Sequence, residues 1–169
     1  ALVDDMVACG MLEEVERDRG RSPKLAATAL GHIASRQMLA PETVLALSRA
    51  LRAPDSSGLS FLDILLVCAS TSDCSPLIAM DFEEIDALGA RLASEPSMLL
   101  AGTHADVLGR LEARGRRLAA IIKTATLARA WTLSGDAGEV AREFGCYAFE
   151  VRRLTESLGQ SFVVDNRPG

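Results

Sequence analysis

The sequence predicts a mainly all-α chain: a helical bundle with one short β-hairpin near its start. Apolar residues recur at the three- and four-residue spacing of helices over most of the 169 residues. A polar stretch around Asp18-Arg19-Gly20 breaks that spacing and is typical of a turn between two short strands. With 49% apolar residues, the chain can bury a real core and is too apolar for a disordered segment.

Residues 1–40 have the order of elements with which a winged-helix domain ends. The apolar spacing of residues 1–12 is helical, and Gly10 is typical of a helix end. The polar hairpin follows, and Thr28 can then cap a helix over 29–38. Helix, two-stranded wing and helix together predict the end of a winged helix. Because the helical spacing is already present at the first residue, we expect the chain to be a piece of a longer protein.

Residues 41–162 are helical in pattern throughout and predict a bundle. Pro41 suits the first turn of a helix over 42–52. Residues 59–70 are apolar on nearly every side, which predicts the buried central helix, whereas 81–94 is amphipathic.

The second half of the bundle is expected to hold one long helix and two shorter ones. A helical pattern covers about 104–133, with a bend expected near Gly115. Asp136 can cap the next helix, which ends at Gly145. The final helix covers about 147–162.

Charge is distributed unevenly along the chain. The net charge of −5 argues against a protein coated in basic charge. Residues 1–100 hold 8 Lys and Arg against 15 Asp and Glu, whereas residues 101–169 hold 10 against 8. We therefore expect any contact with nucleic acid to be local and to belong to the second part.

The sequence carries no motif for a self-contained catalytic site. It has neither a Walker-type phosphate loop nor a Gly-x-Gly-x-x-Gly. The sequence has only two histidines, and its four cysteines lack the Cys-x-x-Cys spacing of zinc ligands, so a zinc site is not expected. We therefore expect no cofactor or metal in this chain, and reduced thiols in a cytoplasmic protein. No apolar stretch approaches the ~20 residues of a membrane helix, and no secretory signal is visible, so no membrane partner is expected.

A cluster of basic residues lies in the long helix. Its members are Arg110, Arg114, Arg116, Arg117 and Lys123. Glu112 lies among them and can pair with Arg116 one turn away, so a solvated helix face is one interpretation. Because most of the arginines lack such a partner, contact with phosphates is the other.

The last helix has two distinct sides at about 100° per residue. Its apolar stripe consists of Val151, Leu154, Leu158 and Phe162. The opposite side carries Arg153, Ser157 and Gln160, with Arg152 and Glu156 on a flank. The helix should therefore bury one side and present arginines on the other, where a guanidinium can hold a phosphate, stack on a base, or simply be solvated.

Several short segments follow one another in a characteristic order. They are Gly10-Met11-Leu12-Glu13, Thr28-Ala-Leu-Gly31 with Ala34-Ser35, Pro41-Glu-Thr43, Leu65-Leu-Val-Cys-Ala-Ser-Thr-Ser-Asp73 with Pro76-Leu77, Lys123-Thr124-Ala125 leading to Trp131, the stretch 139–145, and Glu150-Val-Arg-Arg-Leu-Thr-Glu156. Together they resemble the C-terminal part of superfamily 2 DNA helicases of the HelQ/Hjm type, in the Ski-like branch. The resemblance covers the end of the winged helix (1–40) and the helical ratchet domain (41–162), and leaves 163–169 as a flexible tail.

The resemblance implies a mechanism and a location for the DNA contact. In that family two RecA-like motor domains hydrolyse ATP with Mg²⁺, and the ratchet domain closes a ring around the translocating single strand. A long helix presents an arginine and, two turns on, a tryptophan toward the DNA. By position the arginine falls on Arg153, within the Arg152-Arg153 pair. The tryptophan position falls on Gln160, which cannot stack, so a weaker grip is implied unless Phe162 or another group substitutes.

The function implied by the resemblance is that of a DNA-binding module of an ATP-dependent helicase, which guides single-stranded DNA without sequence preference. Arg152, Arg153 and Gln160 would contact the strand first, and the basic cluster of the long helix second. The implied partners are single-stranded or forked DNA and the RecA-like motor domains of the same polypeptide, where ATP and Mg²⁺ belong. The chain alone should be an inactive monomer. The implied setting is DNA repair, in the cytoplasm at the nucleoid or in a eukaryotic nucleus.

Two other classes of function remain open. Residues 139–154 have the helix, glycine turn and helix spacing of a sequence-specific helix-turn-helix regulator, which would discriminate between duplexes. A non-catalytic protein-interaction bundle is favoured by the acidic first hundred residues, and it predicts that replacing Arg153 leaves DNA affinity unchanged.

Overall fold

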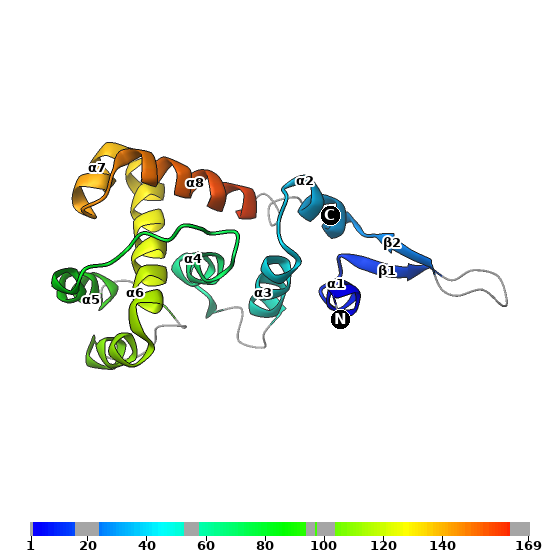
Figure 1. Cartoon of the computed structure of the whole chain (residues 1–169), viewed down its shortest axis with the longest axis horizontal. Coiled ribbons are helices and arrows are strands. Elements are labelled where there is room, and N and C mark those ends of the chain that lie inside the picture. Colours follow the sequence, from blue (N-terminus) through cyan, green and yellow to red (C-terminus); the bar gives the residue numbers. More distant parts are fainter. Residues whose placement is uncertain (1, 16–23, 53–57, 94–96, 98–103, 163–169) are drawn as a thin grey trace.

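The computed structural model describes residues 2–15, 24–52, 58–93, 97 and 104–162; the side chains of 82, 93, 104–114 and 159–162 fall outside the description. Within these limits the fold is mainly helical with one two-stranded sheet, as the sequence predicts. Figure 1 shows an elongated arrangement, with the hairpin at one end and the later helices at the other.

The first elements form a small unit around the hairpin. Helix α1 (Leu2–Ala8) leads into strand β1 (Leu12–Val15), which pairs antiparallel with β2 (Lys24–Ala27), so that Leu12 lies opposite Ala27. Helix α2 (Ala29–Arg36) follows directly. The structure confirms the predicted helix, hairpin and helix, while the expected turn at residues 18–20 lies outside the described part of the chain.

The junction between β1 and α2 depends on Thr28 and Gly31. As predicted, Thr28 is the N-cap of α2: its hydroxyl accepts from the Gly31 N–H at 3.1 Å and donates to the Gly10 carbonyl at 2.5 Å. A Cβ on Gly31 would lie only 2.1 Å from the carbonyl oxygen of Met11. Glycine is therefore required here by close packing against the backbone just before β1.

Helices α3 (Pro41–Arg52) and α4 (Phe61–Ser70) lie next along the chain. Helix α4 begins with a reciprocal capping box, in which the Ser60 hydroxyl accepts from the Asp63 N–H and the Asp63 carboxylate accepts from the Ser60 N–H. The central, buried position predicted for this helix is confirmed, because five of its apolar residues belong to the main core.

The remaining helices follow α4 along the chain. A 3₁₀ turn, η2 (Phe82–Glu84), leads into α5 (Ile85–Ala93), and the long α6 (His104–Ser134) bends at Gly115, where φ is 73° and ψ is −170°. The bend predicted at this glycine is confirmed, and Figure 1 shows the two segments of α6 running in different directions. Asp136 caps α7 (Ala137–Glu143), and α8 (Ala148–Phe162) packs across the far end of α6. Of these helices, α6 and α8 pack on α4, while α5 and α7 pack on α6.

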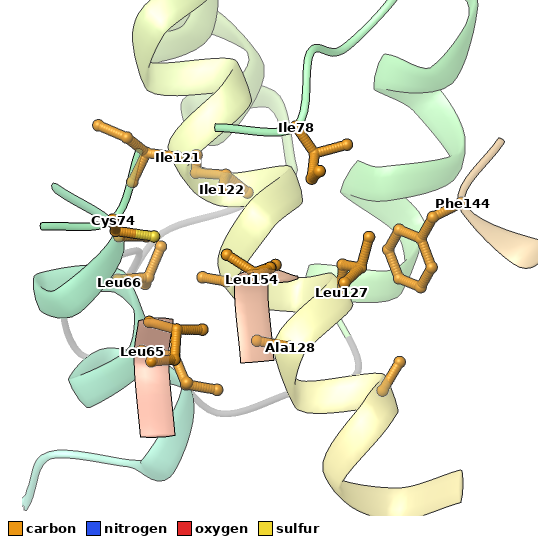
Figure 2. Packing of buried hydrophobic residues seen from close by; sticks show 14 of the residues in the cluster. Leu65, Leu66, Cys74, Ile78, Ile121, Ile122, Leu127, Ala128, Phe144 and Leu154 are labelled. Atoms are coloured by element: carbon orange, nitrogen blue, oxygen red, sulfur yellow. The ribbon is translucent and has the colours of Figure 1, made fainter. Parts of the chain in front are cut away.

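The buried apolar side chains form two clusters. The larger one joins α4, α5, α6, α7 and α8, and Figure 2 shows Leu65, Leu127 and Leu154 among its members, with Leu154 between the other two in this view. The smaller one consists of Cys9, Met11, Ala34, Leu39 and Val44. Helix α3 links them, because Val44 belongs to the smaller cluster while Leu47 packs against the larger. The predicted domain boundary between residues 40 and 41 falls just before this linking helix and stays a prediction.

Candidate nucleic-acid interface

Helix α8 has the two-sided character that its sequence predicts. Val151, Leu154 and Leu158 are buried in the large core, whereas Arg152 and Arg153 are exposed. Among the described residues neither guanidinium forms an ion pair. Because three buried anchors fix the helix, the two arginines are held on its outward side. The side chains of Gln160 and Phe162 lie outside the description.

Arg152 lines an open cleft of about 540 Å³ between the end of α6, the start of α7 and α8. The other residues that line it are Trp131, Gly135, Asp136, Ala137, Thr155 and Glu156. Two carboxylates therefore flank one guanidinium inside the cleft, so its interior does not favour an anion. The outward side of α8, which carries Arg153, is the more suitable place for a phosphate group.

Asp136 links the electrostatics of the cleft to the start of α7. Its carboxylate accepts from the backbone N–H groups of Glu139 at 3.1 Å and Gly138 at 2.7 Å. These hydrogen bonds lower the pKa of Asp136, and the charges of Arg142 and Arg152 lower it further. Asp136 is therefore a firmly ionised cap at the start of α7.

Trp131 is a cleft residue that the helical pattern alone does not identify. It is the only tryptophan of the sequence and is half-buried. It lines the cleft on one side and a smaller adjoining cavity of about 90 Å³, next to Phe61, on the other. Its position three residues before the end of α6 is the signal that could have drawn attention to it.

The arginines of the long helix lie apart from this cleft. Arg116 and Arg117 are exposed just after the bend in α6, and the side chains of Arg110 and Arg114 lie outside the description. At the helical rise, Arg116 and Trp131 are about 22 Å apart along the axis. The structure therefore does not bring Arg116 and Arg117 to the cleft: the bend of α6 and its crossing with α8 lie at opposite ends of the straight part of α6 (Figure 1).

Lys123 differs from the rest of the basic cluster with which the sequence groups it. Its side chain is only 6% exposed, and its Nζ lies 2.7 and 2.9 Å from the two carboxylate oxygens of Glu84. It shares a helix face with Arg116, but η2 and α5 cover that face further along α6. The small and apolar residues on every side of Lys123 are the signal that it lies inside the bundle. Lys123 is therefore not available to a phosphate.

Other kinds of site find little support in the described residues. No three His, Cys, Asp or Glu side chains come together there in a way that could hold a metal ion. None of the four cysteines, all of which the structure describes, forms a disulfide; Cys9, Cys68 and Cys74 are buried, and burial raises the pKa of Cys74 to about 11. Among the helices described, none is long and apolar enough to cross a membrane.

Comparison with known proteins gives no family for this chain. No protein-family model matches it, and no curated protein matches its sequence. The geometry of α8 and its cleft therefore carries the functional argument.

Proposed function

We propose that this chain is the C-terminal DNA-binding module of an ATP-dependent superfamily 2 DNA helicase, and that it guides single-stranded DNA through contacts without sequence preference. The observation that carries the proposal is the exposed Arg152-Arg153 pair on a helix whose opposite side is anchored by Val151, Leu154 and Leu158. A guanidinium fixed in this way can hold a backbone phosphate whatever the base.

The charges around the cleft suggest how the strand would lie. Asp136 and Glu156 repel phosphates from the interior of the cleft, so the backbone would follow the outward side of α8 at Arg153. Arg152, at the cleft wall, would meet the strand from one flank. Arg116 and Arg117 are too distant for the same phosphates and would touch another part of the DNA.

The proposal assigns energy conversion to other domains. ATP and Mg²⁺ would be bound by RecA-like motor domains of the same polypeptide, because this sequence has no phosphate loop. The chain would act as a monomer in DNA repair, in the cytoplasm at the nucleoid or in a nucleus. On its own it should bind single-stranded DNA weakly and hydrolyse no ATP.

A salt titration tests the proposal. If two to four phosphates are contacted, the affinity of the 169-residue chain for labelled oligo(dT) should fall with a logarithmic slope of roughly −1.5 to −3, at about −0.7 per phosphate. Replacing Arg152 and Arg153 by Ala should weaken binding and make the slope shallower by about 1.4. Fluorescence of Trp131, the sole tryptophan, gives a second readout at the cleft.

Arg49→Ala is the matched control for each of the two single replacements, since Arg49 is an exposed arginine on α3 and its loss changes the net charge by one unit, as each of theirs does. It should leave both affinity and slope close to wild type. A flat salt response, or an equal effect of Arg49→Ala, contradicts the proposal. Tight binding to one duplex sequence would support the helix-turn-helix alternative instead.

A further inference from the structure

Two exposed aromatic rings lie at the start of α8. Tyr147 is 71% exposed and Phe149 is 63% exposed, and no other described aromatic side chain exceeds 38%. Their ring centroids lie 5.8 Å apart, with only 18° between the ring planes. The rings therefore stack on each other in solvent instead of filling a core, and each retains accessible surface.

The backbone of this segment fixes the position of the pair. The N–H of Tyr147 donates to the Glu150 carboxylate at 2.8 Å, and its carbonyl accepts from the Glu150 and Val151 N–H groups. Val151, which follows two residues after Phe149, is fully buried. Because the segment is already ordered, a ligand that binds the rings would lose little conformational entropy.

The surroundings of the rings select the class of ligand. Phe149 precedes Arg152 by three residues and Arg153 by four, so all three share the outward side of α8. The described neighbours on that side are charged, namely Arg152, Arg153 and Glu156, and none is aliphatic. Beyond the two rings this side offers no apolar surface over which a protein partner could extend its contact, whereas flat rings beside guanidinium groups suit unpaired bases on a phosphate backbone.

We propose that Tyr147 and Phe149 form a stacking platform for an unpaired base of single-stranded DNA, one helical turn before the phosphate contact at Arg153. The inference rests on the proposed function and adds to it the residues that recognise bases. The two rings would also provide base stacking at α8, although Gln160, at the position of the tryptophan in the helicase family, cannot stack. The strand would meet the platform first and the arginine pair next, or the reverse, along one side of a single helix.

Oligo(dT) and an abasic oligonucleotide of equal length separate stacking from phosphate binding. Phe149→Ala and Tyr147→Ala should each weaken binding of the full chain to oligo(dT) by about 5-fold or more. Binding to the abasic strand, and the salt slope on both probes, should stay unchanged. Phe149→Leu should behave like Phe149→Ala, and Phe149→Trp should restore the affinity. Val3→Ala, an exposed apolar truncation on α1, is the control and should have no effect.

The possible failures are distinguishable. Salt-dependent binding of oligo(dT) that the Phe149 and Tyr147 variants leave intact overturns the stacking platform alone. An equal loss on the abasic strand also overturns it, because a base is then not what the rings contact. If the wild-type chain binds oligo(dT) without salt dependence or not at all, the proposed function fails and the platform with it. Both side chains are exposed, and unchanged circular dichroism and Tm confirm that each variant is folded.

Discussion

Lys123 and Glu84 form a largely enclosed ion pair. Lys123 is nearly fully buried, whereas the Glu84 side chain is 32% exposed. Desolvation pushes the pKa of Glu84 upward, but hydrogen bonds from Lys123 and from the Asp81 N–H outweigh it and hold the pKa below its usual 4.5. The two partners therefore depend on each other unequally, because only the carboxylate has water as an alternative.

This inequality predicts that two substitutions, one in each partner, lower the stability by unequal amounts. Glu84→Gln leaves the buried Lys123 ammonium with one acceptor oxygen in place of two, and should lower the free energy of unfolding by about 2–3 kcal/mol. Lys123→Met leaves a carboxylate that water can reach and should cost below about 1 kcal/mol. Urea unfolding at pH 7 measures both. Equal losses would contradict the burial argument.

The same pair has a defined pH dependence. Because the folded pKa of Glu84 is lowered, its contribution is fully present above pH 4.5 and is lost as the pH falls through the folded value. The stability difference between wild type and Glu84→Gln should therefore be constant near neutral pH and shrink in acid. A difference that persists at low pH would exclude Glu84 titration as its source.

At the level of single residues, the sequence predicts burial or exposure where helical geometry alone determines on which side of a helix a residue lies. Arg152 and Arg153 are exposed as expected because Val151, Leu154 and Leu158 fix the rotation of α8. Lys123 could not be placed in this way, since its burial depends on η2 and α5, which are distant in sequence. Helical geometry places Phe149 on the same outward side as Arg153, so this position could be predicted from the sequence. Only the structure shows that its ring is exposed.

Among the elements, α6 is the one whose geometry depends on a single residue. The φ of 73° and ψ of −170° at Gly115 form a combination open essentially to glycine alone. A Cβ there would meet nothing within 4 Å, so the constraint comes from the backbone and not from packing. Helical sequence on both sides would otherwise continue straight through.

Gly115→Ala should therefore destabilise the chain by about 1–3 kcal/mol, or straighten α6 into one continuous helix. Chemical denaturation measures the first outcome, and a rise in helicity by circular dichroism reports the second. Arg116→Ala is the control, because it truncates an exposed neighbour without a backbone constraint. Wild-type stability and helicity in Gly115→Ala would show that the bend is not set by this residue.

The ends of helices were predictable where the sequence has a capping residue or a glycine at that position. Thr28, Asp136 and Gly145 mark the ends of helices in the structure as they do in the pattern. The region 81–94 is different, since its first turn is a 3₁₀ turn and not part of one continuous α-helix. There the Glu84 carboxylate binds back to the Asp81 N–H, a contact that periodicity does not reveal.

At the scale of the molecule, two cores of unequal size share one linking helix. Periodicity identifies the buried face of each helix but not which faces meet, so the sequence predicted a winged-helix end over 1–40 and a bundle over 41–162 but not that α3 packs against both clusters. The smaller cluster has five buried members, and the larger one draws on five helices. Since local stability follows buried apolar contact, the two parts should open at different free energies.

Native-state hydrogen exchange tests this division. Amides of α4 and of α6 beyond the bend should exchange slowest, and those of α1 and α2 should exchange faster through partial opening. Val44→Ala, in the smaller cluster, should accelerate exchange in α1 and α2 while leaving α6 protected. Leu65→Ala, in the larger cluster, should cost about 2–5 kcal/mol and lower protection in α4, α6 and α8 together. If Val44→Ala lowers protection equally in every helix, α3 couples the two cores into one cooperative unit, and α8 then moves with the hairpin instead of independently of it.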